Sequence, residues 1–327
     1  SHVAAMSKNT PYQLLSPETI LDSVDARGLM TTGHLLALNS YENRVYMVGI
    51  EAHPGVVAKF YRPNRWTEAQ IREEHEFLFE LADEDIPVVA PWKDEAGESL
   101  WRYKDFFMCL FPKRSGHPLE LDNNRHLEQI GSLLGRLHAY GSAKPFEHRI
   151  KLTPTEFGWN ARDKVLASGY LPFELESSYQ TVTAHVLEAI DIIWNRVGAT
   201  NQRIHGDFHP GNILYRDQQP WLVDFDDAVM GPRVQDLWML FSGNADQQQG
   251  QLNHILKGYE QFTEFDDAEL QLVECCRALR ILNYAAWLSQ RWDDPAFPKA
   301  FPWFDSPRFW SDHILQLREQ LATLTHN

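Results

Sequence analysis

The stretch I-H-G-D-F-H-P-G-N-I-L, residues 204–214, and the run L-V-D-F-D-D that begins at Leu222 decide the fold of this chain. An acidic residue follows each apolar run, and Asn212 stands five positions after Asp207. Phosphoryl transfer from a magnesium-bound nucleotide needs a carboxylate, an amide and a second carboxylate in this order. We therefore expect Asp207 to accept a proton from the acceptor hydroxyl, and Asn212 and Asp224 to bind Mg²⁺.

A metal site of another kind is the main alternative. His205, Asp207 and His209 alternate, so on a strand they would share one face and offer two imidazoles and a carboxylate. A hydrolytic metal site, however, needs neither the amide of Asn212 nor the second acidic run. A third interpretation, a core histidine with a capping aspartate, does not explain why both acidic clusters stand at the ends of apolar strands.

Composition places the chain among ordinary globular proteins and limits its partners. It has 327 residues, 43% hydrophobic and 23% charged, which indicates one large domain or two modest ones. The net charge of −15 opposes non-specific binding to nucleic acid or to anionic membranes. Cys109, Cys275 and Cys276 lie in apolar contexts and are expected to be buried free thiols. With no long apolar segment and no signal peptide in view, we expect a cytoplasmic protein.

The first third of the chain reads as a small β-rich unit with one helix. Short runs rich in β-branched and aromatic residues predict strands at 45–50, 55–61, 100–103 and 106–111. An apolar stripe after the candidate N-cap Thr67 predicts a helix over 67–82.

After the linker-like stretch F-P-K-R-S-G-H-P the pattern becomes helical. Helices are predicted at 127–137, 182–196, from Asp266 with a D-x-x-E cap to Trp292, and at 309–324, with a surface loop at 293–304. Gly131 and Gly135 would allow the first of these helices to pack closely on another element. We thus expect an α+β protein, with a β-rich lobe over 1–111, a hinge at 112–118 and a helical lobe over 119–327.

These motifs resemble the catalytic loop and the metal-binding aspartate of the protein-kinase-like superfamily. The form H-G-D-x-H-x-x-N is similar to the aminoglycoside and choline phosphotransferase branch. The chain most resembles the bacterial stress response kinase A family, whose members phosphorylate protein Ser/Thr. The stretches L-N-S-Y-E-N-R-V-Y, V-V-A-K-F-Y-R-P, P-V-V-A-P, V-Q-D-L-W-M-L and W-D-D-P-A-F-P-K-A-F-P-W carry this resemblance from about residue 38 to 304. It implies a two-lobed protein-kinase-like fold that binds ATP and Mg²⁺.

For the first lobe the resemblance implies a nucleotide site. Lys59 matches the strand lysine that contacts the α- and β-phosphates, and Glu74 is the best match for its helix glutamate, with Glu73 and Glu76 as competitors. The backbone at 110–111, formed by Leu110 and Phe111, would contact the adenine. Loop 39–44 lacks the glycines of a phosphate-binding loop, so backbone amides and the Ser40 hydroxyl would contact the phosphates. Ser40 is also a candidate for self-phosphorylation, although simple turn formation explains it too.

For the second lobe the resemblance assigns the base to Asp207, the metal ions to Asn212 and Asp224, and bracing of the catalytic loop to Asp236. The extra acids at 226–227 are better explained as solvated acids or a helix cap.

Two further features concern the acceptor side of the predicted site. Only 11 residues separate Asp224 from Asp236, which leaves no room for a long activation segment. Arg277, Tyr284 and Arg291, with Arg280 beside them, form a basic and aromatic stripe that faces either the substrate cleft or solvent.

The expected function is ATP- and Mg²⁺-dependent phosphoryl transfer to protein Ser/Thr, in a stress response, as the family resemblance implies. The short activation segment and the acidic second part of the chain favour the alternative of a small-molecule alcohol acceptor. A pseudokinase that only binds its ligands is a third alternative, and the presence of every required residue type argues against it. We expect neither nucleic acid nor a membrane as partner.

Overall fold

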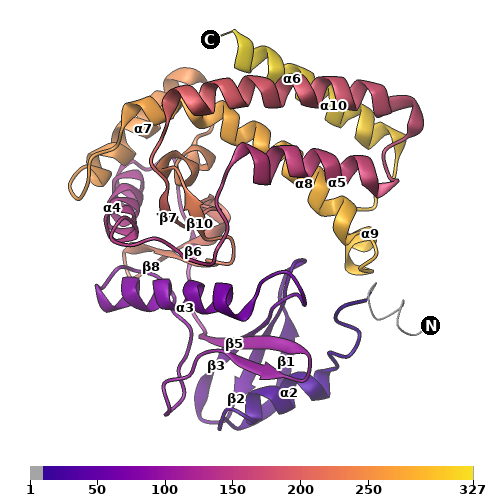
Figure 1. Cartoon of the computed structure of the whole chain (residues 1–327). Helices are drawn as coiled ribbons and strands as arrows, with labels where there is room; N and C mark the ends of the chain where they lie inside the picture. The colour runs from indigo at the N-terminus through magenta and orange to yellow at the C-terminus, as the bar shows by residue number, and fades with distance from the viewer. Residues whose placement is uncertain (1–9, 327) are drawn as a thin grey trace.

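A five-stranded antiparallel sheet with the order β1-β2-β3-β5-β4 forms the first lobe (Figure 1). The computed structural model describes residues 10–326. The strands of this sheet are β1 (Thr31–Ala37), β2 (Arg44–Ile50), β3 (His53–Phe60), β4 (Trp101–Tyr103) and β5 (Phe106–Pro112). Helix α2 (Pro17–Asp25) covers one face through Ile20 and Val24, which join Val48, Phe60 and Met108 in a small core. The central position of β3 fixes Lys59, which pairs with Val45 on one side and Cys109 on the other.

Helix α3 (Glu68–Asp83) lies between the sheet and the second lobe (Figure 1). Thr67 begins it, as predicted, and forms a capping box with Gln70 that satisfies otherwise unpaired backbone N–H groups. Its buried face includes Ile71, Phe77 and Leu78. The helix therefore contributes apolar side chains to the cores of both lobes. Its polar residues are thereby held toward the space between the two lobes.

The second lobe is mainly helical and carries the catalytic stretch on short strands. Its helices are α4 (Asn124–Gly141), α5 (Asn160–Ser168), α6 (Phe173–Val197), α7 (Ala245–Tyr259), α8 (Val273–Arg291), α9 (Ala296–Ala300) and α10 (Pro307–Thr325). Its strands are β6 (His117–Pro118), β7 (Gln202–Ile204), β8 (Ile213–Arg216), β9 (Gln219–Leu222) and β10 (Val229–Gly231). They form a three-stranded sheet, β6-β8-β9, and a two-stranded one, β10-β7. These strands lie between α3 and the large helices (Figure 1).

Helices α4 and α7 pack at unusually short range, which confirms the prediction for the α4 glycines. A Cβ atom added at Gly131 would lie 1.8 Å from the Ile255 carbonyl oxygen, and one at Gly135 would lie 2.5 Å from the Tyr259 carbonyl oxygen. No real side chain tolerates such contacts, so only glycine permits this helix pair.

Two details of the predicted elements need correction. Strand β5 runs on through Pro112 and β6 begins at His117, and the hinge at 112–118 stays a prediction. The helix predicted from Asp266 begins as a 3₁₀-helix over Asp267–Leu272 before α8 starts. Glu269 does not complete the predicted cap, because its carboxylate accepts a hydrogen bond from the Val234 backbone N–H. The division into domains at 1–111 and 119–327 stays a prediction.

The surface loop predicted at 293–304 was also wrong. This segment contains α9, and the rings of Phe297 and Phe304 are completely buried. Aromatic side chains dominate the segment because it covers the end of α8, where Trp292 packs on Phe304. Burial of large rings outweighed the turn-forming tendency of its prolines. The three cysteines are buried and free, as predicted. Within residues 10–326 no helix has the length and apolar character needed to cross a membrane.

Candidate active site

The buried carboxylate of Asp236 holds the loop that follows β7 through hydrogen bonds to its backbone. Its Oδ2 accepts from the backbone N–H of His205 (2.9 Å) and its Oδ1 from that of Gly206 (2.8 Å). His138 Nε2 contacts the same carboxylate at 2.9 Å, and His138 Nδ1 lies 2.7 Å from the Tyr259 hydroxyl. Asp236 is completely buried, so these hydrogen bonds replace those it would make to water. The structure thus confirms the prediction that Asp236 braces this loop through hydrogen bonds from its backbone N–H groups.

Gly206 must be glycine for two reasons. Its φ of +90° belongs to the left-handed region, and an added Cβ would lie 2.2 Å from the Asp227 carbonyl oxygen. The catalytic loop thus approaches the acidic segment after β9 more closely than any side chain would allow.

The alternative metal site of two histidines and Asp207 does not form. Strand β7 ends at Ile204, so the alternation of residues 205–209 does not place them on one strand face. Both ring nitrogens of His205 are engaged, Nε2 with the Val223 carbonyl oxygen (3.0 Å) and Nδ1 with the Asp207 N–H (3.1 Å). Across residues 10–326 no group of three or more His, Cys, Asp or Glu side chains is arranged to hold a metal ion. His205 is therefore a structural residue of the loop.

Three side chains surround the carboxylate of Asp207. Arg280 Nη1 lies 3.0 Å from Oδ1, while His209 Nε2 and Asn212 Nδ2 each lie 3.3 Å from Oδ2. Burial alone would raise the pKa of Asp207, but the hydrogen bond and charge of His209 together with Arg280 outweigh it and hold the pKa below its usual range. The carboxylate is thus ionised and able to accept a hydrogen bond.

Asn212 and Asp224 stand on neighbouring loops as potential metal ligands. Asn212 donates from its side-chain amide nitrogen to the Asp207 backbone carbonyl oxygen (2.9 Å). The backbone carbonyl oxygen of Asn212 accepts from the Val223 N–H (2.9 Å). In the described part of the chain no hydrogen bond engages its amide oxygen. Asp224 is exposed and has a φ of +58°, a left-handed conformation that aspartate tolerates better than most residues. An amide oxygen and a carboxylate are the hard oxygen ligands that suit Mg²⁺.

Lys59 contacts the acidic segment of the second lobe directly. Its Nζ lies 3.1 Å from Asp226 Oδ1, and the two side chains are only 8% and 6% exposed. Arg65 pairs with the other oxygen of Asp226 and, at 2.6 Å, with Asp227. Burial favours the neutral lysine, yet Asp226 and then Glu74 raise the pKa of Lys59 well above its usual value.

The interpretation of the extra acids as solvated or capping was therefore wrong for Asp226, which is buried between two cations. Burial would raise its pKa, but Lys59 and Arg65 hold the pKa far below the usual range. Asp227 is 47% exposed on its side chain and lies at the cleft. Enclosure by neighbouring groups and the charges of nearby acids, partly offset by Arg65, raise the pKa of Asp227 to about 6.

Among the three candidate glutamates of α3, the geometry favours Glu74. Glu74 is completely buried near Lys59, and its Oε2 accepts a hydrogen bond from the Tyr61 hydroxyl (3.1 Å). Its Oε1 is buried without a hydrogen-bond partner among the described residues. Burial is the main reason that the pKa of Glu74 is raised, and Lys59 counteracts it. Glu73 instead accepts three backbone N–H bonds from residues 147–149, and Glu76 is exposed.

Loop 39–44, which connects β1 and β2, is held against the second lobe by Glu42. Its Oε1 binds Arg291 Nε at 2.8 Å and Arg62 Nε at 2.7 Å, and Trp287 donates its indole N–H to Oε2. Arg291 and Trp287 belong to α8, so this acidic residue joins the predicted phosphate loop to the helical lobe.

The rest of the loop repeats this attachment. Arg62 also binds Asp294 at 2.6 Å, and Tyr41 packs edge-on against Phe297 of α9, with 6.3 Å between ring centroids. Ser40 is half-buried in the same loop. Its predicted contact with phosphate and its predicted self-phosphorylation stay predictions.

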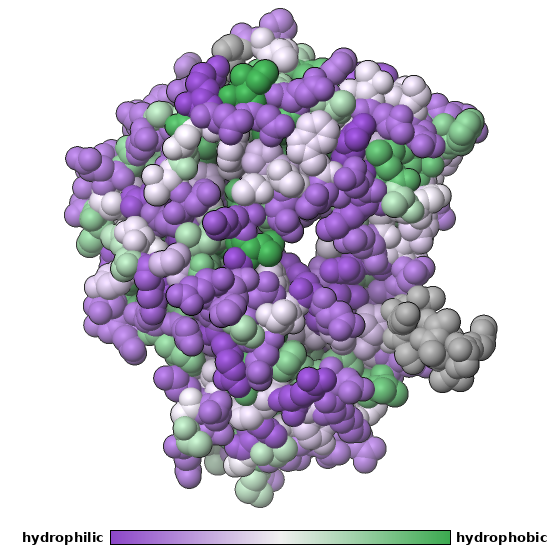
Figure 2. All heavy atoms as spheres, viewed as in Figure 1, coloured by the Kyte–Doolittle hydropathy of each residue, from purple (hydrophilic) through white to green (hydrophobic). Residues whose placement is uncertain are grey.

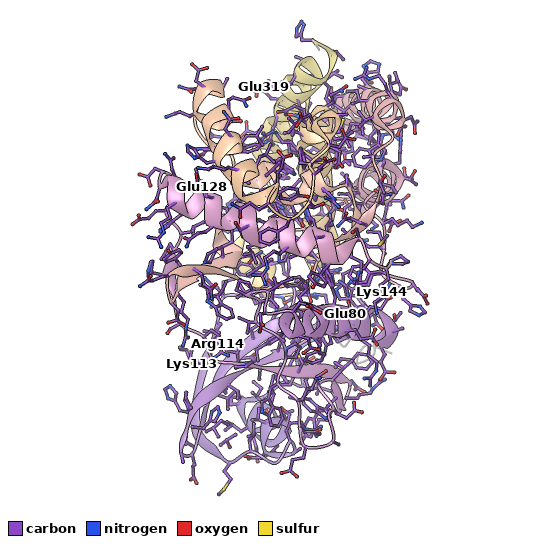
Figure 3. All side chains as sticks on the ribbon, turned by 90° about the vertical axis from the view of Figure 1, so that its left-hand side faces the viewer. Glu80, Lys113, Arg114, Glu128, Lys144 and Glu319 are labelled. Atoms are coloured by element: carbon purple, nitrogen blue, oxygen red, sulfur yellow. The ribbon has the colours of Figure 1, made fainter. Side chains whose placement is uncertain are left out.

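The segment predicted to contact adenine lies at the end of β5. Leu110 and Phe111 are paired with β3, and the Leu110 carbonyl oxygen already accepts from the Trp92 N–H (2.7 Å). An adenine contact would therefore fall to the other backbone groups of this segment. The chain then passes to the second lobe through the exposed residues Lys113 and Arg114 (Figure 3).

A hollow opens between the two lobes in the space-filling view, and hydrophilic side chains surround most of it (Figure 2). The lobes also touch through ion pairs. Glu80 of α3 pairs with Lys144, beside it in Figure 3, and with Arg203 at 2.6 Å. The polar character of the cleft suits a charged ligand such as a nucleotide.

The basic stripe expected on α8 divides into separate roles. Arg280 pairs with Asp207, and Arg291 pairs with Glu42. Arg277 instead pairs with Glu274 on its own helix, at 3.0 Å. Only part of the stripe therefore faces the cleft, and that part runs from Asp207 to the loop at 39–44.

Comparison with known proteins agrees with this geometry. The model of the phosphotransferase enzyme family matches residues 34–273. The chain is 42% identical to the serine/threonine protein kinase RdoA of Salmonella typhimurium and 41% identical to the stress response kinase A of Escherichia coli K12. Each match is over 313 residues, covering 96% of this chain and 94% of the relative. The chain belongs to the stress response kinase A family. It is accordingly a kinase of the wider phosphotransferase enzyme family.

Comparison with solved structures shows that this member of the stress response kinase A family has the protein-kinase-like fold. The amicoumacin kinase hAmiN, solved in complex with AMP-PNP, Ca²⁺ and Ami, has a TM-score of 0.71 at 21% identity, with 93% of each chain covered. The choline kinase LicA of Streptococcus pneumoniae has a TM-score of 0.65 at 15% identity, with 94% of this chain and 99% of the other covered. The two-lobed α+β fold expected from the sequence is thus confirmed.

Sequence reasoning missed two arginines that organise the site of this kinase. Arg65 bridges Asp226 and Asp227, and Arg149 donates to the backbone carbonyl oxygens of Asp226 and Ala228, each at 2.7 Å. Both lie in connecting segments, far along the chain from their partners. The only available signal was that an acidic cluster at the end of a buried strand requires nearby cations.

Proposed function

We propose that this kinase transfers the γ-phosphoryl group of Mg·ATP to a Ser or Thr hydroxyl of a protein. The observation that carries the proposal is the convergence of Asp207, Asn212 and Asp224 on adjoining loops, with Lys59 reaching the same acidic segment from the opposite lobe. The names of the 42% and 41% identical relatives support the protein acceptor and a role in stress response. We place the protein in the cytoplasm, which supplies ATP and keeps thiols reduced.

Each residue has a proposed task in this reaction. Asp207 accepts a hydrogen bond from the acceptor hydroxyl, orients its oxygen toward the γ-phosphorus and takes its proton as the bond forms. Asn212 and Asp224 hold Mg²⁺, which when bound neutralises charge on the phosphate oxygens. Lys59 contacts the α- and β-phosphates as a compact positive charge and gives up part of its contact with Asp226. Glu74, whose Oε1 has no hydrogen-bond partner within residues 10–326, then takes over the pairing with Lys59.

A small-molecule alcohol is the second candidate acceptor. Two observations favour it: only 11 residues separate Asp224 from Asp236, and two solved structures of similar fold are named as kinases of amicoumacin and of choline. A long activation segment commonly forms part of the platform for a protein substrate, and this chain has no room for one between these two residues.

Radiolabelled ATP offered with separate acceptor pools tests both candidates. Purified wild-type protein is incubated with [γ-³²P]ATP and Mg²⁺, and either heat-inactivated lysate proteins or a lysate filtrate of small metabolites. We expect label on Ser and Thr of proteins, and a loss of at least about 10³-fold in Asp207→Asn. Asp312→Asn, an exposed change of the same chemistry on α10, is the matched control and should keep full activity.

The outcomes separate the alternatives. Label confined to metabolites would replace the protein acceptor by a small alcohol. Binding of Mg·ATP without any transfer by the wild type would identify a pseudokinase. Equal activity in wild type and Asp207→Asn would show that the transfer comes from a contaminant.

A further inference from the structure

Arg280 makes an ion pair that protein stability does not explain. Its guanidinium lies 3.0 Å from Asp207 Oδ1, although the two residues are 73 positions apart in the chain. The Arg280 side chain is 51% exposed and that of Asp207 is 21% exposed, and an ion pair with an exposed, solvent-screened partner contributes little to folding. The position of Arg280 therefore requires a reason other than folding.

The face of α8 that carries Arg280 extends along the cleft. Trp287, two turns further on, and Arg291 bind Glu42 in the loop at 39–44. Two helical turns cover about 10 Å. Arg280 consequently stands at the end of this face nearest to Asp207, on the side where a γ-phosphoryl group must lie if the loop at 39–44 holds the other phosphates.

We propose that Arg280 is a further catalytic residue, a positive charge supplied within the chain that stabilises the phosphoryl group during transfer. The inference rests on the proposed function. An acceptor hydroxyl must come within hydrogen-bond distance of Asp207, where Arg280 now donates, so the arriving hydroxyl displaces the guanidinium. The nearest acceptors for its N–H groups are then the equatorial oxygens of the γ-phosphoryl group. Arginine suits this role because its planar donors match phosphate oxygens.

The step balances without any further reactant. The acceptor oxygen forms a bond to the γ-phosphorus while the bond from that phosphorus to the β–γ bridging oxygen breaks, and the electron pair stays with ADP. The hydroxyl proton passes to Asp207. Arg280 keeps all its protons and contributes only charge and hydrogen bonds to the transfer.

Substitutions on α8 test the proposal with purified full-length protein. The probe is hydrolysis of [γ-³²P]ATP with water as acceptor, followed by phosphorylation of the lysate pool. We expect Arg280→Ala to lower kcat by about 10²–10³-fold, the loss typical of removing one transition-state donor. Arg280→Lys, which keeps the charge without the planar fork, should fall between. Arg277→Ala, one turn earlier and paired within its own helix, is the matched control and should keep the wild-type rate.

Two additional readouts separate catalysis from a structural role. The Kd for Mg·ATP, measured by thermal shift, should stay within about threefold of wild type in Arg280→Ala, because the cation acts during transfer. Added guanidinium should restore part of the lost rate in Arg280→Ala and none in Asp207→Asn. A rate for Arg280→Ala equal to or above that of wild type would overturn the proposal, and a higher rate would identify the ion pair as an inhibitory contact. If the wild type itself neither binds nor hydrolyses Mg·ATP, the proposed function fails instead.

Discussion

Replacement of Asp226 by asparagine should strongly destabilise the protein even without nucleotide. Asp226 is enclosed by Lys59 at 3.1 Å and by Arg65, and the side chains of the lysine and aspartate are less than a tenth exposed. The substitution Asp226→Asn preserves size but removes the negative charge. Lys59 is then left in a buried position with an amide in place of its main partner, and burial of an unpaired charge is costly.

The magnitude follows from the distance. At 3.1 Å and an effective dielectric constant of about 20, two unit charges attract by about 5 kcal/mol. Part of this is offset because Asp226 no longer loses its hydration, and part because the unpaired Oε1 of Glu74 is available to Lys59. We therefore expect a loss of about 3 kcal/mol in the free energy of unfolding, at the lower end of the range for broken buried ion pairs.

Urea unfolding followed by tryptophan fluorescence measures this loss, since the chain has 11 tryptophans. The matched control is Asp227→Asn, the adjacent residue, whose half-exposed pair with Arg65 should contribute less than about 1 kcal/mol. Adding Lys59→Met to Asp226→Asn should restore about 2 kcal/mol, because the buried ammonium that lost its main partner is then no longer present. Equal losses in the two single Asp→Asn variants, or no recovery in the double variant, would refute the reasoning.

Two other predictions concern packing and pH. Gly131→Ala should lower the free energy of unfolding by at least about 2 kcal/mol, since its Cβ would lie 1.8 Å from the Ile255 carbonyl oxygen. The control Gly250→Ala on α7 has open space around it and should raise the free energy of unfolding by up to about 1 kcal/mol. Equal effects of the two substitutions in a urea titration would contradict this account. Burial lowers the pKa of His313 to about 4. Between pH 6.5 and 4 the unfolded chain therefore binds a proton that the folded protein does not. The free energy of unfolding consequently decreases as the pH is lowered through this range. In His313→Leu the loss of stability from pH 7 to pH 5 should be smaller by about 2 kcal/mol, and an unchanged pH dependence would show that His313 is protonated in place.

Local patterns predicted the parts of the protein that local chemistry determines. The strands of the sheet and the N-cap at Thr67 depend on neighbouring residues, so the sequence indicated them, apart from β1. The candidate catalytic loop could be proposed because Asp207 and Asn212 stand at a fixed spacing within one loop, and its role stays a prediction. Helix α7 was missed although Asn244 and Gln247 form a capping box before it, a signal that the sequence carries openly.

What the sequence did not reveal depends on contacts between distant segments. Nothing near Asp226 distinguishes it from the half-exposed Asp227, because the difference arises from Lys59 on β3 and Arg65 after it. The segment at 293–304 looked like a loop because its prolines are local and its buried aromatic contacts are not. Arg280 likewise could not be separated from Arg277 by helical periodicity, which places both on overlapping faces of α8.

The left-handed backbone of Asp224 matters for anyone who builds an inactive variant for genetic work. At a φ of +58° most side chains strain the backbone, while aspartate and asparagine are among those that tolerate it best. Asp224→Ala would therefore combine the loss of a carboxylate with a backbone penalty, and a reduced cellular level of the protein would imitate a loss of catalysis. Asp224→Asn removes the charge alone. A phenotype obtained with the asparagine variant can be attributed to chemistry, and one obtained with alanine cannot.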